Sequence, residues 1–130
     1  MKILAISLLL LVSVSHAMDP PAIEWYRVYS QYNEFLDVLE TPEGFAASTY
    51  DAIVYVDQSG NITSEVTSED FGWHYMKFQS LIPSYQGGLV STGVGKLASD
   101  SSYSLFIAEL SSEAAPTWSR NYDYPDATEY

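Results

Sequence analysis

The feature that most restricts the fold of this chain is an internal repeat of aromatic residues. The segment "EWYRVY" (Glu24–Tyr29) recurs as "TWSRNY" (Thr117–Tyr122), with Trp, Arg and Tyr at the same spacing. Trp25 and Trp118 lie 93 residues apart, and Trp73 stands close to the midpoint. This spacing agrees with structural repeats of roughly 40–50 residues. We therefore expect similar units that follow one another along the chain.

Two longer matches support the repeat. "FLDVLETPEGFAAST", from Phe35, matches "FQSLIPSYQGGLVSTG", from Phe78: an apolar pair, a turn, a glycine, a second apolar pair and small polar residues. "YDAIVYVDQSGN", from Tyr50, matches "YSLFIAELSSEAA", from Tyr103, although the second copy lacks the acidic residue and the glycine of the turn. The predicted organisation is a lead at 18–22, a first β repeat at 23–72, a second at 73–117 and a truncated third at 118–130.

Between the turns the chain is mostly β-forming. Aromatic and β-branched residues alternate with polar ones in short runs bounded by Gly, Pro, Asp and Asn, a pattern typical of strands. No segment sustains the 3.6-residue apolar period of an amphipathic helix. The expected strands are Ile23–Ser30, Glu34–Thr41, Gly44–Tyr50, Ala52–Asp57, Asn61–Thr67, Trp73–Ile82, Gly88–Val94 and Tyr103–Leu110. We expect an all-β fold of antiparallel, four-stranded, blade-like repeats; the alternative is a small β-sandwich.

The order of these features resembles a known family. Trp-x-Arg-x-Tyr, a turn with glycine, a small-residue strand and Asp-x-x-Gly-Asn follow one another as in bacterial exported repeat proteins of the β-propeller type. The resemblance covers nearly all of residues 23–130 and implies four strands per blade. It implies structural roles for Trp25, Arg27, Tyr29, Gly44, Asp57, Gly60, Trp73, Gly88, Trp118, Arg120 and Tyr122.

The length holds only about two such blades. Closed propellers contain roughly 4–8 blades, and the third repeat stops soon after it begins. We therefore expect a partial β-propeller: a fragment of a longer protein, or a chain that oligomerises or requires further blades.

The first seventeen residues predict export. Lys2 precedes an apolar run from Ile3 to Val14, and Ser15 and Ala17 supply the small residues of a cleavage site after Ala17. The run is shorter than the roughly 20 residues of a membrane span; a signal anchor is the alternative. We expect a secreted protein, extracellular or periplasmic, that does not span the membrane after cleavage of this segment.

The charge and the composition of the chain argue against several kinds of partner and active site. The chain has 17 acidic and 5 basic residues and a formal net charge of −12, which repels phosphate backbones and argues against nucleic-acid partners. Cysteine is absent, which excludes a cysteine nucleophile, and His74 is the only histidine after Ala17. Zinc is therefore improbable, and we expect no cofactor.

One polar segment has three interpretations. In "DQSGN", Asp57, Ser59 and Asn61 alternate oxygen ligands as in a calcium loop, but Gly60 comes one residue early and no glutamate closes the loop. The preferred interpretation is a turn, in which Asp57 accepts backbone N–H groups and Gly60 takes a positive φ. The segment beginning at Asn61 also fits a glycosylation acceptor, which matters only in a eukaryotic secretory pathway.

The remaining candidates are aromatic rings and carboxylates. The three recurring tryptophans are expected in the core, whereas Tyr122 and Tyr124 are possible ligand-facing aromatics. Glycosidases need two facing carboxylates. The close acidic pairs are Glu69 with Asp70, Glu40 with Glu43, and Asp126 with Glu129, and most of them are expected to be solvated surface.

These features favour a protein without catalytic activity. We expect an exported β-repeat protein that acts as a scaffold or as a binding surface for protein or glycan. The alternative is a fragment of a carbohydrate-active β-propeller enzyme that uses carboxylates.

Overall fold

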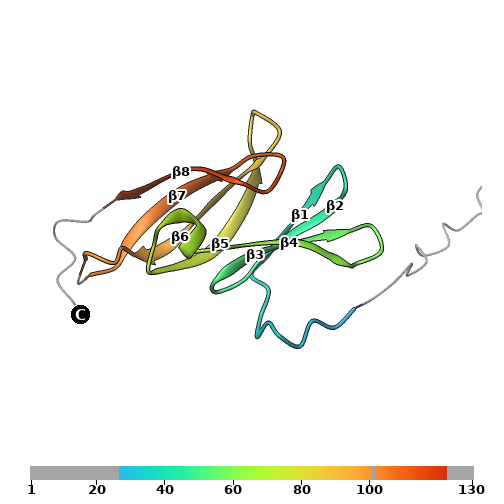
Figure 1. Cartoon of the computed structure of the whole chain (residues 1–130), viewed down its shortest axis with the longest axis horizontal. Helices are drawn as coiled ribbons and strands as arrows, with labels where there is room; N and C mark the ends of the chain where they lie inside the picture. The colour runs from blue at the N-terminus through green and yellow to red at the C-terminus, as the bar shows by residue number, and fades with distance from the viewer. Residues whose placement is uncertain (1–26, 101, 123–130) are drawn as a thin grey trace, which may run out of the picture.

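The computed structural model describes residues 27–100 and 102–122, which form two four-stranded antiparallel sheets (Figure 1). The first sheet contains β1 (Asp37–Thr41), β2 (Gly44–Ser48), β3 (Ala52–Asp57) and β4 (Ile62–Thr67). The second contains β5 (Tyr75–Pro83), β6 (Leu89–Lys96), β7 (Ser104–Leu110) and β8 (Pro116–Tyr122). Within the described residues there is no α-helix, only the 3₁₀ turn η1 (Glu69–Phe71). The predicted all-β fold with four-stranded antiparallel sheets is confirmed.

Each sheet is a meander in which the strands lie in chain order. This order follows from the short turns, because a short connection joins strands that are neighbours and antiparallel. Strand β8 pairs with β7 and completes the second sheet. Residue 118, where the sequence predicts a third repeat to begin, lies inside β8, and residues 123–130 of that predicted repeat lie outside the described part of the chain.

The predicted strand Ile23–Ser30 is wrong over its described part, because residues 27–30 lie in no strand. Their side chains bind the β3–β4 turn instead. The Nε of Arg27 donates to the carbonyl of Ser59 at 3.2 Å, and the hydroxyl of Tyr29 donates to the carbonyl of Gly60 at 2.6 Å. Side-chain hydrogen bonds, rather than a strand ladder, hold this segment on the first sheet.

The core lies between the two sheets. Strand β5 contacts β1, β2 and β3 of the first sheet. The rings of Phe78 and Phe106 meet edge to face with centroids 5.7 Å apart, and Trp73 packs on Phe106 at the same centroid distance. The fully buried apolar side chains of this cluster come from both sheets: Ala46, Ile53 and Val66 from the first, and Met76, Phe78, Leu81, Leu89, Phe106, Ala108 and Leu110 from the second.

A glycine at the start of the second strand of each sheet permits close backbone approach. A Cβ on Gly44 would lie 2.1 Å from the carbonyl oxygen of Val56, and a Cβ on Gly88 would lie 1.8 Å from that of Leu110. Both distances are far below van der Waals contact, and the obstructing atoms are backbone. The two glycines aligned by the sequence repeat therefore occupy equivalent places in the two sheets, where only glycine fits.

This packing predicts different costs for two adjacent glycines. Gly88→Ala should lower the free energy of unfolding by about 2 kcal/mol or more, because the added methyl overlaps backbone atoms that cannot move aside. Gly87→Ala, at φ 89° with no atom near its Cβ, should cost about 1 kcal/mol from the left-handed backbone alone. Urea unfolding of both variants measures the difference. Equal stability of the two variants would contradict the close approach at Gly88.

Candidate functional site

The segment from Asp57 to Asn61 is the β3–β4 turn. One carboxylate oxygen of Asp57 accepts the backbone N–H groups of Ser59 at 2.9 Å and Asn61 at 2.8 Å, and the other accepts the Asn61 side-chain amide at 2.9 Å. These bonds, that of the Asn61 side chain above all, lower the pKa of the Asp57 carboxyl. Gly60 has φ 78°. The turn interpretation is confirmed, since both carboxylate oxygens hold the turn together.

The β7–β8 turn has the same geometry with different residues. The hydroxyl of Ser111 accepts the backbone N–H groups of Glu113 and Ala115, both at 3.3 Å, and Ala114 has φ 59°. Ser111 therefore replaces Asp57, and Ala114 replaces Gly60. The second repeat therefore keeps the turn although it lacks the acidic residue and the glycine, because a hydroxyl can accept the same two hydrogen bonds.

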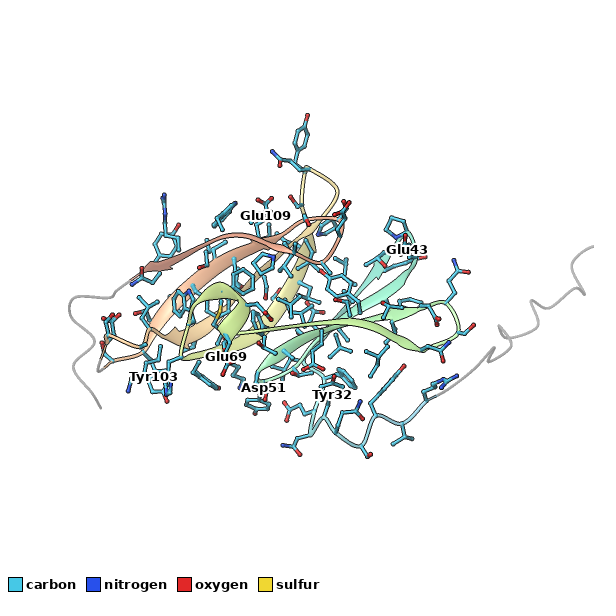
Figure 2. The ribbon with its side chains drawn as sticks, viewed as in Figure 1. Tyr32, Glu43, Asp51, Glu69, Tyr103 and Glu109 are labelled. Carbon is cyan, nitrogen blue, oxygen red and sulfur yellow. The ribbon has the colours of Figure 1, made fainter. Side chains whose placement is uncertain are left out.

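A groove of about 380 Å³ lies between the sheets, lined by residues of the β1–β2, β5–β6 and β7–β8 turns. Three carboxylates line it: Glu40, Glu43 and Glu113. Figure 2 shows Glu43 at the tip of the β1–β2 hairpin. Apolar groups such as Leu39 and Pro83 supply part of the wall, and none of the lining residues is basic. The groove therefore combines negative charge with apolar surface.

Tyr55 of β3 also lines this groove. Its hydroxyl is buried and has no hydrogen-bond partner within residues 27–100 and 102–122. Burial raises the pKa of Tyr55 to about 12, so the hydroxyl keeps its proton at neutral pH. A buried polar group without a partner is costly, so this hydroxyl lowers the stability of the fold rather than facing a bound molecule.

A second polar cluster lies around Glu109 on β7 (Figure 2). The carboxylate of Glu109 accepts hydrogen bonds from the hydroxyl of Ser84, from Nε1 of Trp118 at 2.6 Å and from Oγ1 of Thr117 at 3.1 Å. The Ser84 bond is the main cause of the lowered pKa of Glu109. The carboxylate thus stays charged and fixes the indole of Trp118, which is 46% exposed.

The predicted structural residues have different environments. Trp73 is buried and donates from Nε1 to the hydroxyl of Ser119 at 2.9 Å, as expected of a core residue. Trp118 is exposed on the sheet surface, so its predicted core position is wrong for the described chain. Arg120 and Tyr122 are exposed on the same strand. Trp25 and Tyr124 lie outside the described residues.

The predicted acidic pairs also lie in different environments. Glu40 and Glu43 both line the groove. Asp70 instead serves the local structure, because its carboxylate accepts the backbone N–H of Thr67 at 2.7 Å. Asp126 and Glu129 lie outside the described residues, and His74 is exposed. In the part of the chain that the structure describes, no three His, Cys, Asp or Glu residues are grouped as metal ligands.

Two residues of the groove could not be identified from the sequence. Tyr55 resembles any aromatic residue of a strand, and Glu113 stands in a polar turn; only the fold brings them to one groove. The sequence contains a weak indication that Glu109 is unusual, because it is an acidic residue within the otherwise apolar strand segment "FIAEL".

Comparisons of the chain with protein-family models, with curated proteins and with solved structures found no match. Among the residues with described placement, no helix is long and apolar enough to cross a membrane.

The two equivalent turns predict opposite effects of exchanging Ala and Gly. Ala114→Gly should raise the free energy of unfolding by about 1 kcal/mol, because glycine avoids the left-handed penalty at φ 59°. Gly60→Ala should lower it by a similar amount for the same reason. Thermal unfolding of both variants tests this pair, and destabilisation by Ala114→Gly would be inconsistent with the turn geometry.

The lowered pKa of Asp57 predicts a pH dependence. The ordinary value is 3.8 and the folded value lies below it, so the contribution of Asp57 is complete well above pH 3.8. It is lost as the pH falls through the folded pKa. Unfolding of the wild type and of Asp57→Asn should be compared across this range. The stability difference in favour of the wild type should shrink towards acid pH; a constant difference would show that the carboxylate charge is irrelevant to the turn.

Proposed function

We propose that this chain is a non-catalytic, exported binding module, in which paired blade-like sheets of a partial β-propeller support a groove for an extended protein segment. The observation that carries the proposal is the inter-sheet groove, where Glu40, Glu43 and Glu113 surround apolar wall residues. Two antiparallel four-stranded sheets are consistent with blade-like units. The N-terminal sequence supports a site of action outside the cytoplasm, extracellular or periplasmic.

The groove suits a segment that carries lysine or arginine. Long basic side chains place their methylene stems on apolar surface and their charged ends near carboxylates, and the groove offers both kinds of surface. Charged and apolar contacts together favour a basic protein segment over a neutral small molecule.

The close pair of Glu40 and Glu43 does not have the arrangement of a glycosidase pair. The two carboxylates of a glycosidase face each other across the scissile bond. Glu40 and Glu43 instead come from one hairpin, at the end of β1 and in the turn that follows it. This arrangement supports a binding role over the alternative of a carbohydrate-active enzyme fragment.

A peptide-binding experiment tests the proposed function. The probes are a fluorescent peptide of alternating Lys and Leu and its Glu and Leu counterpart, with binding followed by fluorescence anisotropy. The basic peptide should bind and the acidic one should not. The variant Glu40→Gln/Glu43→Gln/Glu113→Gln should weaken binding of the basic peptide about tenfold or more, since charged contacts are worth roughly 1 kcal/mol each at exposed sites.

A matched control removes three carboxylates outside the groove: Glu34→Gln/Glu69→Gln/Asp100→Asn. It has the same net charge as the groove variant and should bind almost as well as the wild type. Equal losses in both variants would show that net charge alone attracts the peptide, and the groove proposal would be wrong. Preferential binding of a neutral oligosaccharide, lost in Trp118→Ala, would replace the peptide by a glycan. Glycan hydrolysis abolished by Glu40→Gln would overturn the non-catalytic role.

A further inference from the structure

The two sheets have the same strand order, and they also share the irregularities of their strand pairing. The register shift between β3 and β4 at Tyr55 and Val56 recurs between β7 and β8 at Glu109 and Leu110. The hydroxyl of Thr63 donates to the carbonyl of Tyr55 at 3.3 Å, and that of Thr117 donates to the carbonyl of Glu109 at 3.0 Å. Each strand residue of the first sheet therefore has an identifiable equivalent in the second.

Equivalent residues do not face each other in the core. The second sheet packs on the first with the face that carries Phe78, Leu81, Leu89, Ala108 and Leu110. The equivalents of these residues in the first sheet are Phe35, Val38, Phe45, Val54 and Val56, which line a hollow on its other side, away from the core. The sheets are thus stacked in the same sense, like successive members of a series, and are not related as mirror halves of a sandwich.

This stacking leaves one apolar face of the first sheet only partly covered. We name it the leading face; it comprises Phe35, Val38, Phe45, Ala47, Val54 and Val56 and surrounds a hollow of about 670 Å³. Tyr29 also lines this hollow and packs on Phe35, and Val54 is buried, but Phe35 is 43% exposed and Val38 63% exposed. Their equivalents Phe78 and Leu81 are 0% and 5% exposed. The leading face therefore has the composition of a core face and is only partly covered in the described chain.

The second sheet has a matching uncovered face. We name it the trailing face; it comprises Ile82, Val90, Thr92, Leu105, Ile107, Trp118 and Arg120, which alternate along their strands with buried or half-buried core-side residues. Ile82 is 54% exposed. Its equivalent Leu39 packs on the core, as do Ala46 and Ile53, the equivalents of Val90 and Ile107.

We propose that a second copy of this chain seats its trailing face on the leading face of the first. This contact would repeat between chains the contact that already joins the two sheets within one chain. Glu40 borders the leading face, whereas the trailing side carries both Arg120 and Glu109, whose carboxylate accepts a hydrogen bond from Trp118. The leading face shares Glu40 and Val56 with the lining of the groove, but the residues altered in the test below lie outside the groove.

The contact is heterologous, because it joins two different surfaces and leaves one of each free at the ends. Successive additions therefore form a closed ring or an open chain. Closed rings of such sheets hold roughly 4–8 sheets, which corresponds to about two to four copies of this chain.

Two charge insertions test this geometry. Val38→Asp alters the leading face and Ile82→Asp the trailing face, and both positions are exposed, so the fold should persist by circular dichroism. The wild type should show a mass of more than one chain by light scattering, and each variant alone should be a monomer. A mixture of the two variants should give a species of two chains, because each supplies the face that the other lacks. Tyr85→Asp, at a fully exposed hairpin tip outside both faces, should assemble like the wild type.

Other results identify other arrangements. If Val38→Asp dissociates the assembly and Ile82→Asp does not, two leading faces pair with each other and the head-to-tail contact is wrong. Dissociation by both variants without formation of a mixed pair would also overturn it. A wild type that remains a monomer at every accessible concentration would mean that another segment or another protein covers these faces.

Discussion

The contact between the two sheets is the interaction on which the rest of the structure depends. Phe78 and Phe106 fill the space between them, and neither sheet buries its other face to the same extent. A polar link adds to the apolar contact, since the carboxylate of Asp37 in β1 accepts the backbone N–H of Leu81 in β5 at 2.7 Å. The chain has no cysteine, so no disulfide can replace this packing.

The strands and turns were largely predictable from the sequence, because they depend on residues that are neighbours in the chain. The bounds of β3 agree with the prediction, because β-branched residues end there at a polar turn. Gly44 and Gly88 were aligned by the repeat alone and prove sterically equivalent. The covered face was not predictable. A period of two residues separates the faces of a strand, but a remote partner decides which face is buried, and so Trp118 lies exposed.

The candidate groove could not be predicted either, because three turns distant in sequence form it. Tyr55 and Glu109 show why residue type alone is a poor guide. They are equivalent positions of β3 and β7, yet burial raises the pKa of Tyr55 to about 12, whereas hydrogen bonds lower the pKa of the half-buried Glu109. The second sheet covers the first at Tyr55, and no described residue covers Glu109 in that way. The position of each sheet in the stack, rather than the residue pattern of the strand, therefore decides how buried the side chain is and in which direction its pKa shifts.

Charge is the principal force against self-association, because a net charge of −12 repels a second copy. The proposed contact reduces this cost in two ways. Glu109 adjoins the trailing face, but its oxygens already accept three side-chain hydrogen bonds, so its burial leaves no unsatisfied carboxylate. Arg120 brings one of the 5 basic residues of the chain to a face whose counterpart borders Glu40. An interface that contains a basic residue, and whose acidic residue already has hydrogen-bond partners within its own chain, can form even though the chain is strongly acidic. The apolar area that is buried then decides the strength of the contact.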